Sequence, residues 1–368
     1  MTTLPSDIRA LFTARGADLV DVAILQPADP FLDMAGEDLR RRIFLTESET
    51  GEQLCLRPEF TIPVCLDHIR TQSGTPRRYA YLGEVFRQRR GGRAEFFQAG
   101  IEDLGDTDIA SADARLIADA HALLMLALPR TPLAVTLGDQ SVFEAVLAAL
   151  GLPRGWQKRL ARAFGAPEQL AAALADLANP QRKRGLGQPA ARLVAARDRE
   201  ALSAHIGQTM EEHGLALAAG RTPDDIARRL IEKAELGAVR LSEEAFAALK
   251  TFLAIRVPLA DAASTLARFA DESELYLDTA LDLFKARAEA VAGQALGADI
   301  TYDAGFGRPL DYYTGMVFEI AAPGASQPLA GGGRYDRLLT LLGAKNPIPG
   351  VGFSVWLDRI EALRGGTA

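Results

Sequence analysis

The chain contains few of the residues that build metal sites or disulfides. It has two cysteines, Cys55 and Cys65, and four scattered histidines in 368 residues. The cysteines lack the spacing of metal ligands and the histidines form no cluster, so the pattern argues against a metal centre. We therefore expect no metal and no other cofactor. Both cysteines are interpreted as reduced core thiols of a cytosolic protein.

Surplus positive charge and long apolar runs are also missing. Lys and Arg number 41 against 48 Asp and Glu, which gives a formal net charge of -7. An acidic chain offers no overall electrostatic signal for nucleic acid, so we expect no nucleic-acid partner. The N-terminus lacks a basic-then-apolar signal pattern, and no run approaches the ~18 apolar residues of a membrane span. These absences predict a cytoplasmic protein with no membrane partner.

The chain does have enough apolar material, 48% of its residues, for a large core, and its length predicts about two domains. Residues 1–150 mix strand and helix patterns. Residues 151–294 are rich in Ala, Leu and Arg with helical periodicity, which predicts a helical insertion. Within them, the run Arg182-Lys183-Arg184 is interpreted as a solvated loop cluster, because the chain is acidic. Strand patterns return over residues 295–368.

Within the first block, a helix is expected from Ser111 to a stop at Pro129, and a strand from Leu133 to Leu137. Asp139 and Ser141 are candidate N-caps for the next helix. Gly151 and Pro153 are expected to end that helix, and with it the first block.

A strand pattern from Glu95 to Leu104 carries polar groups that suit a ligand better than a core. Its even positions place Gln98, Gly100 and Glu102 on one face. Glycine has no side chain, so the pattern predicts a slot about 7 Å long between two hydrogen-bonding groups. A slot of that kind fits an amino acid.

A second strand pattern runs from Arg78 to Arg87, before the turn signal Gly91-Gly92. Alternation places Arg87 on the same face as Gly83, so a charge is expected above bare backbone. Upstream lies the segment Leu56-Arg-Pro-Glu59-Phe-Thr61. Any one of these residues alone fits a solvated face or a surface ion pair, but together they favour a site for a small zwitterionic ligand.

Three further motifs follow near the C-terminus. In the segment 308–319, Tyr313 and Gly315 are expected on one strand face, so the tyrosine ring would border an empty space above the glycine. The glycines of segment 330–336 predict either close approach of backbone to a ligand or a flexible hairpin loop with positive φ. Segment 349–359 begins like a strand and runs into an amphipathic stretch.

These blocks resemble motif 2, the histidine-specific signature and motif 3 of class II aminoacyl-tRNA synthetases of the histidyl type. The segment Ile24-Leu-Gln-Pro27 resembles motif 1, which builds the dimer interface in that family. The resemblance covers about residues 1–150 and 295–368. It implies an α+β fold: a mixed, mainly antiparallel sheet with flanking helices, built from the two ends of the chain and interrupted by the helical insertion. It also implies self-association as a dimer.

The resemblance further implies a histidine site. By that likeness Glu59, Thr61 and Gln98 hold the α-amino and carboxylate groups of histidine. Arg87 and Arg308 match the phosphate-facing and carboxylate-facing arginines of the family. The charges agree, because a carboxylate prefers arginine as its partner.

Three residues complete this site by the same likeness. Glu102 and Tyr313 address the imidazole ring, and Tyr335 closes the pocket. A ring N–H and an ammonium group both prefer carboxylates, which fits the placement of two glutamates in the set.

Three departures from the synthetase pattern argue that the chain does not make histidyl-tRNA. Arg89 stands where synthetases have a glutamate that reads the adenine amino group. The loop from Arg87 to Gln98 is short for the family. Trp356, three residues before Arg359, stands where a glycine normally leaves room for adenine, although a helix residue packed into the core would also explain it.

The chain also ends soon after Arg359, where histidyl-tRNA synthetases continue into an anticodon-binding domain. What remains resembles the regulatory subunits of ATP phosphoribosyltransferase, synthetase paralogues that partner the short catalytic form of the first enzyme of histidine biosynthesis. This implies a non-catalytic histidine sensor that activates that enzyme and mediates feedback. The alternatives are a truncated histidyl-tRNA synthetase, another histidine-activating ligase, or a structural paralogue with a relic pocket.

Overall fold

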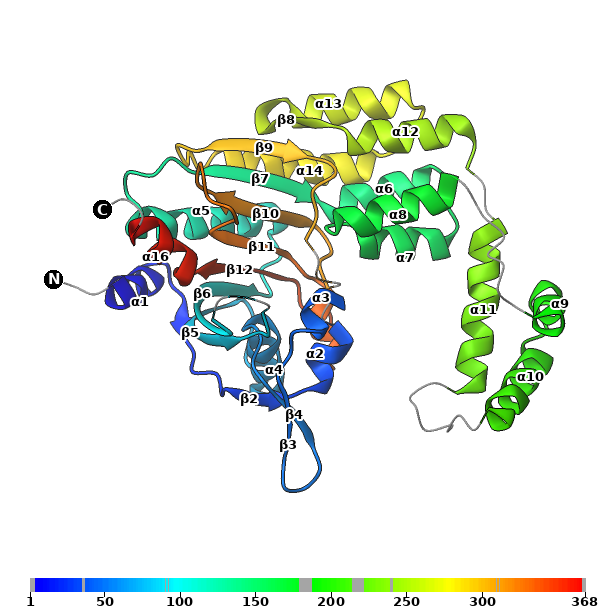
Figure 1. Ribbon diagram of the computed structural model, residues 1–368. Helices are drawn as coiled ribbons and strands as arrows, with labels where there is room; N and C mark the ends of the chain where they lie inside the picture. Colours follow the sequence, from blue (N-terminus) through cyan, green and yellow to red (C-terminus); the bar gives the residue numbers. More distant parts are fainter. Residues whose placement is uncertain are drawn as a thin grey trace.

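A computed structural model describes residues 4–34, 37–89, 91, 93–178, 187–213, 222–238, 241–308, 310 and 312–365. Strands occupy the two ends of the chain and helices dominate the middle (Figure 1). The strands are β1 (Asp18–Leu19), β2 (Leu25–Pro27), β3 (Leu45–Glu47), β4 (Gln53–Leu56), β5 (Arg77–Phe86), β6 (Glu95–Leu104), β7 (Ala134–Asp139), β8 (Arg256–Pro258), β9 (Asp299–Asp303), β10 (Met316–Ala321), β11 (Ala330–Arg334) and β12 (Gly350–Trp356). The helices are α1 (Leu4–Ala14), α2 (Asp29–Met34), α3 (Glu37–Arg40), α4 (Thr61–Thr71), α5 (Ile109–Ala127), α6 (Gln140–Ala149), α7 (Arg154–Ala163), α8 (Pro167–Ala178), α9 (Gln188–Ala196), α10 (Arg199–Glu212), α11 (Pro223–Ala238), α12 (Glu243–Leu253), α13 (Leu259–Glu272), α14 (Asp278–Ala292), α15 (Leu338–Leu341) and α16 (Leu357–Gly365).

The main sheet has nine strands in the order β1-β5-β6-β12-β11-β10-β7-β9-β8. Its pairs are antiparallel except β1 with β5 and β7 with β9. The two expected strands form the hairpin β5–β6, and β6 then pairs with β12 from the opposite end of the chain. The predicted α+β fold with a mixed, mainly antiparallel sheet is therefore confirmed.

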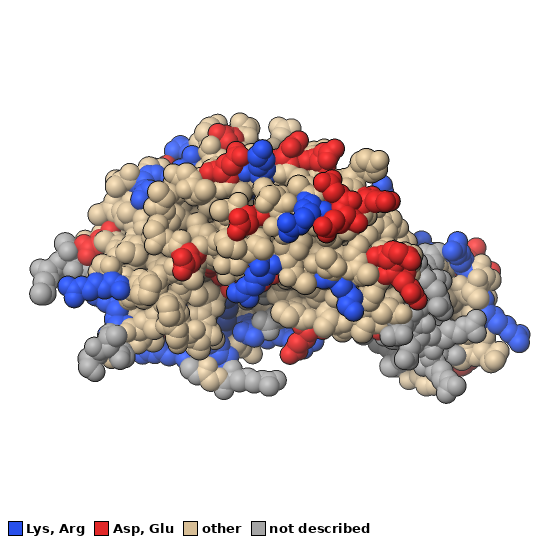
Figure 2. Space-filling model, turned by 90° about the horizontal axis from the view of Figure 1, so that it is seen from above, with Lys and Arg blue, Asp and Glu red and all other residues tan. Residues whose placement is uncertain are grey.

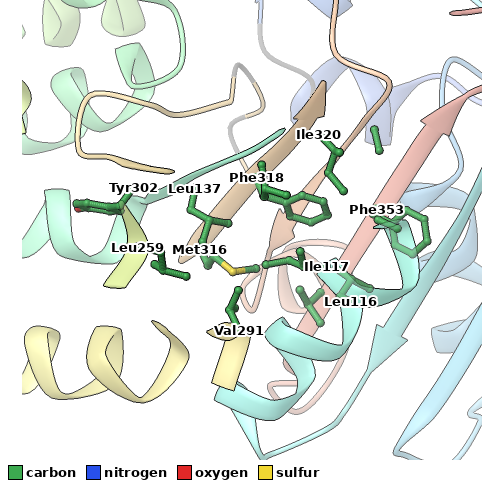
Figure 3. Close-up of a cluster of buried hydrophobic side chains, with 14 of the residues drawn as sticks. Leu116, Ile117, Leu137, Leu259, Val291, Tyr302, Met316, Phe318, Ile320 and Phe353 are labelled. Carbon is green, nitrogen blue, oxygen red and sulfur yellow. The ribbon is translucent and has the colours of Figure 1, made fainter. Parts of the chain in front are cut away.

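The core lies between this sheet and the long helix α5. Leu116 and Ile117 of α5 lie close to Phe318 and Phe353, which come from β10 and β12 (Figure 3). Helix α5 starts at Ile109, slightly before the expected Ser111, because the side chain of Asp108 accepts a hydrogen bond from the Ser111 N–H. Apolar side chains at helical spacing thus cover one face of the strands.

The cap predicted for the next helix is present. The Asp139 carboxylate accepts hydrogen bonds from the N–H groups of Ser141 and Val142 at the start of α6. The helix ends before Gly151, which has a φ of +72°. Both ends of α6 are therefore fixed by local sequence.

Residues 151–294 are not helical throughout. Strand β8 pairs antiparallel with β9 at the edge of the main sheet, and α14 packs against α5. By contrast, α9, α10 and α11 share a small apolar cluster of their own and lie apart from the sheet (Figure 1). Domain boundaries at 151 and 294 stay a prediction, and the run Arg182-Lys183-Arg184 lies outside the described residues.

Short strands β2, β4 and β3 form a separate three-stranded sheet. It contains the segment that resembles motif 1. Ile24, Leu25 and Leu45 are 44%, 52% and 50% exposed. This small sheet therefore presents large apolar side chains to solvent.

The described residues bear on the expectations about membrane spans, metal sites and cysteines. In the described part of the chain, no helix has both the length and the apolar character needed to cross a membrane. The same residues contain no group of three or more His, Cys, Asp or Glu side chains that could hold a metal ion. Cys55 and Cys65 are free and buried. On the face seen in Figure 2, acidic and basic side chains are interspersed.

Candidate functional site

A cavity of about 120 Å³ opens between the sheet, the start of α4 and the segment after β9. A cavity needs roughly 10–15 Å³ of volume on this measure to hold one water molecule. A cavity of about 120 Å³ therefore has room for a molecule the size of an amino acid. Seven of the predicted site residues line it: Glu59, Thr61, Arg87, Gln98, Arg308, Tyr313 and Tyr335. Residues nearly 300 positions apart in the sequence thus meet around one small space.

The Glu59 side chain lines the cavity just before the start of α4. Its carboxylate accepts hydrogen bonds from the N–H groups of Thr61 at 2.6 Å and Ile62 at 2.9 Å. Burial raises the pKa of Glu59, while these two N–H groups and the nearby Arg87 oppose the rise. Glu59 therefore caps the helix as well as lining the cavity.

Gln98 and Trp356 are paired across β6 and β12, and both line the cavity. Gln98 Oε1 and Trp356 Nε1 are buried and have no hydrogen-bond partner among the described residues. Arg308 Nε, on the segment after β9, is in the same state. Buried polar atoms without partners are costly, so three of them around one cavity indicate a polar ligand or bound water.

Glu102 lies behind the cavity wall rather than in it. Its side chain is fully buried, and it is absent from the described residues that line the space. One carboxylate oxygen accepts from the Thr61 hydroxyl at 2.7 Å, and the other accepts from the Tyr335 hydroxyl. Burial raises the pKa of Glu102 to about 8, against the lowering effect of these hydroxyls. Glu102 is thus separated from the cavity by Thr61, Tyr335 and the bare backbone of Gly352, where a Cβ would lie 1.7 Å from its Oε2.

The slot expected over Gly100 is filled. A Cβ atom at Gly100 would lie 2.4 Å from the Tyr81 hydroxyl oxygen. Tyr81 faces Gly100 from β5, and its hydroxyl donates to the carbonyl of Phe353 at 2.9 Å. The cross-strand tyrosine thus occupies the gap, so this prediction was wrong.

The charge expected above Gly83 comes from Arg57 rather than Arg87. A Cβ at Gly83 would lie 2.9 Å from an Arg57 guanidinium nitrogen, and Arg57 Nε donates to the carbonyl of Glu84 at 2.7 Å. Arg87 instead lines the cavity and donates from Nε to the carbonyl of Pro58 at 2.7 Å. The arginine of the first motif therefore joins strands, and the arginine at the end of β5 faces the site.

The glycines of segment 330–336 form a buried strand and not a loop. Among them, Gly331 lies directly under Arg308, because a Cβ there would be 2.1 Å from Arg308 Nη1. Arg308 Nη1 also donates to Glu319 Oε1 at 2.5 Å. The hairpin loop with positive φ was therefore wrong, and close approach of this backbone to a ligand stays a prediction.

Tyr313 and Gly315 were expected within a strand, but β10 begins only at Met316. Tyr313 reaches the cavity from the irregular segment before that strand. Its neighbour Tyr312 lines the cavity too and meets the Tyr335 ring edge-on, with centroids 5.9 Å apart. Sequence reasoning missed Tyr312, although two adjacent tyrosines beside a polar motif were the available signal.

Of the two residues expected to block adenine, Trp356 is among the described residues that line the cavity and Arg89 is not. The Arg89 guanidinium covers the Phe96 ring at 3.9 Å and lies 3.6 Å from Asp358. Trp356 is the last residue of β12 and not a helix residue, and the Arg359 guanidinium covers its ring at 4.1 Å. The Trp356 indole therefore borders the cavity, with the Arg359 guanidinium against its ring.

Four arginines gather here: Arg87, Arg89, Arg308 and Arg359. The pKa of Arg359 is lowered to about 10, first by burial and then by the other three arginines, while Asp358 opposes the shift. The pKa of Arg87 is also lowered to about 10, first by burial and then by Arg89 and Arg308 against the pull of Glu59. This clustering favours a bound anionic group.

The family model described as Histidyl-tRNA synthetase matches residues 1–222 and 226–360. A solved structure described as an ATP phosphoribosyltransferase regulatory subunit/histidyl-tRNA synthetase from Bacillus halodurans C is similar with a TM-score of 0.65 and 22% identity, covering 98% of this chain and 78% of that one. Histidyl-tRNA synthetase from Nostoc sp. PCC 7120 gives a TM-score of 0.65 at 18% identity, over 99% of this chain and 72% of that one. At these identities the structures show the shared fold alone.

Two curated relatives decide the family. The ATP phosphoribosyltransferase regulatory subunit of Mesorhizobium japonicum is 71% identical over 98% of this chain and 97% of its own length. The chain belongs to the family of ATP phosphoribosyltransferase regulatory subunits. The member from Chelativorans sp. is 65% identical over the same shares of the two chains. These relatives are named as regulatory and not catalytic subunits, which agrees with the prediction that this chain is not the catalyst.

Proposed function

We propose that this regulatory subunit binds histidine in the cavity and, by assembly with the short-form ATP phosphoribosyltransferase catalytic subunit, activates that enzyme and mediates its feedback control. The names of the relatives support the partnership, because a regulatory subunit acts only through a catalytic one. The set of polar groups around the cavity supports the ligand. A cytoplasmic location stays a prediction.

The cavity groups match the parts of a histidine molecule. Arg87 and Arg308 are cations that suit its carboxylate, and the Glu59 carboxylate suits its ammonium group. Tyr313 and Tyr335 bring hydroxyls for the imidazole ring, with Glu102 behind Tyr335. The observation that carries the proposal is this convergence of both charge signs on one amino-acid-sized space.

Regulation requires only that histidine bind differently to the active and inactive assemblies. A coupling free energy of ~1–3 kcal/mol is typical of such systems. The chain is proposed to enter the assembly as a dimer through the three-stranded sheet, since closed symmetric assemblies are the common solution. The exposed Leu25 and Leu45 support this surface.

The rival function is activation of histidine by ATP, as in a truncated synthetase or another ligase. Arg89 and Trp356 argue against it: the indole of Trp356 lines the cavity, and Arg89 replaces the glutamate that would read the adenine amino group. A relic pocket is also disfavoured, since buried polar groups such as Gln98 are costly to retain without a role.

Titration calorimetry of the isolated chain with histidine and with ATP tests the ligand. We expect a heat of binding for histidine and none for ATP. A pyrophosphate-exchange assay adds the check on chemistry. Exchange that depends on histidine would overturn the regulatory function in favour of the ligase.

The partner is tested by mixing the chain with the short phosphoribosyltransferase of the same organism. The two should co-elute as one larger species with raised phosphoribosyl-ATP formation, and histidine should suppress the complex more than the isolated enzyme. Separate elution, with unchanged activity and unchanged histidine sensitivity, would contradict the proposal.

A further inference from the structure

The backbone of Arg308 rests directly on the turn between α7 and α8. Gly165 forms this turn with a φ of +95°, and a Cβ atom there would lie 2.4 Å from both the N and the C atoms of Arg308. No real side chain tolerates such a distance to backbone. Gly165 therefore does more than permit a left-handed turn, because it lets two backbone segments touch.

The contact is reciprocal. A Cβ at Gly307 would lie 2.6 Å from Phe164 Cδ1 and 2.7 Å from the Gly165 nitrogen. Each segment thus has a glycine where the other presses against it. The helical segment and the loop before β10 meet with no side chain between their backbones.

The turn itself is anchored from behind by aromatic packing. Phe164 is 2% exposed, and its ring stacks on Phe143 of α6 with centroids 4.3 Å apart. Phe143 in turn stacks on Phe252 of α12 at 6.2 Å. Stacked rings in a dense core shift little, so this packing holds the α7–α8 turn in place.

On the other side of this contact, the Arg308 side chain faces the cavity. It is 10% exposed, is paired with Glu319, and keeps Nε without a partner. Gly331 lies beneath its guanidinium, so the side chain has little freedom to compensate for a shift of its backbone. The position of the Arg308 guanidinium in the cavity thus depends on the α7–α8 turn, against which the Arg308 backbone packs.

We propose that the α7–α8 turn is a positioning element for Arg308 and that it couples the cavity to the packed helices α6, α7 and α12. The proposal rests on the proposed histidine site. By reciprocity, whatever displaces the turn changes the affinity of the cavity for a carboxylate, and a bound carboxylate restrains the turn.

The chain offers a matched pair of variants. Gly151 also has a positive φ of +72°, but a Cβ there would meet nothing within 4 Å. Gly165→Ala and Gly151→Ala therefore share the backbone strain, and only the first adds the collision with Arg308. A difference between them isolates the contact.

Calorimetry with histidine and with histidinol, which lacks the carboxylate, reads out the role of Arg308. In Gly165→Ala we expect histidine affinity to fall about tenfold relative to Gly151→Ala, as for loss of one charge-assisted hydrogen bond, with histidinol affinity nearly unchanged. Equal affinities in the two variants, or equal losses for both ligands, would overturn the positioning role. Absence of histidine binding to the unaltered chain would instead contradict the proposed function.

Amide hydrogen exchange tests the support without any ligand. Residues 304–308 should exchange faster in Gly165→Ala than in Gly151→Ala. Gly307→Ala, which enters the same contact from the opposite side, should repeat the effect if Gly165→Ala fails to fold. Unchanged protection of the segment in these variants would overturn the proposal.

Discussion

The Thr61 hydroxyl, at the start of α4, donates to a carboxylate oxygen of Glu102 on β6 at 2.7 Å. The Tyr335 hydroxyl donates to the other oxygen of the same carboxylate. One fully buried glutamate thus holds two groups that line the cavity. Glu102 therefore orients the hydroxyls of Thr61 and Tyr335. Burial also raises its pKa above the ordinary value of a glutamate.

Replacing Glu102 should change how stability depends on pH. Burial raises the pKa of Glu102 from 4.5 to about 8, so between these pH values the folded state holds a proton that the unfolded state releases. The contribution of this group to stability therefore falls as pH rises through that window. Glu102→Gln removes the titration, and its unfolding free energy relative to the unaltered chain should increase from pH 5 to pH 9 by on the order of a few kcal/mol. Denaturant unfolding at the two pH values measures this, and parallel pH profiles would rule it out.

Replacing Gln98 should separate binding from stability. Its Oε1 atom is buried without a partner, so Gln98→Leu should leave the melting temperature unchanged or raise it. Histidine affinity should fall by about tenfold to a hundredfold, because the ligand loses a buried hydrogen bond. Calorimetry and thermal unfolding provide the two readouts.

Gln140 is the matched control for this prediction. It is 8% exposed, and its Nε2 donates to Glu144 at 3.0 Å and to the carbonyl of Ala161 at 3.3 Å. Gln140→Leu should lower the melting temperature and leave histidine affinity intact. The hypothesis for Gln98 fails if both variants lose stability alike and Gln98→Leu still binds normally.

A buried ion network behind the site should be essential to the fold. Asp113 on α5 contacts Arg334 of β11 at 2.6 Å and Arg287 of α14 at 2.9 Å, and all three side chains are at most 5% exposed. Asp113→Ala leaves two buried cations without this partner, so the free energy of unfolding should drop by about 3–5 kcal/mol. Urea unfolding measures it.

The exposed pair of Arg199 and Asp224, with side chains 51% and 50% exposed, supplies the comparison. Asp224→Ala should change the free energy of unfolding far less than Asp113→Ala does, because solvent screens the exposed pair. Similar losses in Asp113→Ala and Asp224→Ala would show that burial does not govern the network.

The proposed dimer surface can be tested by introducing charged side chains into it. Leu25→Glu combined with Leu45→Glu places one carboxylate on each face of the three-stranded sheet, because Leu25 pairs with Leu56 and Leu45 with its neighbour Cys55. Both positions are exposed, and a carboxylate at an interface would have to be desolvated on association. Sedimentation should then report a monomer. Leu341→Glu on α15, at a residue 57% exposed, should leave the dimer intact. A double variant that still sediments as a dimer would place the interface elsewhere.

Local sequence determined the elements that carry the site. The strand pattern after the turn signal Gly91-Gly92 predicted β6 with its bounds, Glu95–Leu104, and Asp139 was predicted as a candidate cap of α6. Such features depend on neighbours within a few residues, where propensity and capping act directly. The resemblance to histidyl-type synthetases, together with the polar groups of these motifs, predicted seven residues that line one cavity.

Tertiary structure decided which of those residues face the cavity. Gln98 and Glu102 lie on the same face of β6, yet only Gln98 reaches the space, because the hydroxyls of Thr61 and Tyr335 cover Glu102. Tyr81 fills the gap at Gly100 because its hydroxyl finds the carbonyl of Phe353, a residue 272 positions away. Contacts between distant segments depend on how the sheet is assembled, and alternation along one strand carries no information about them.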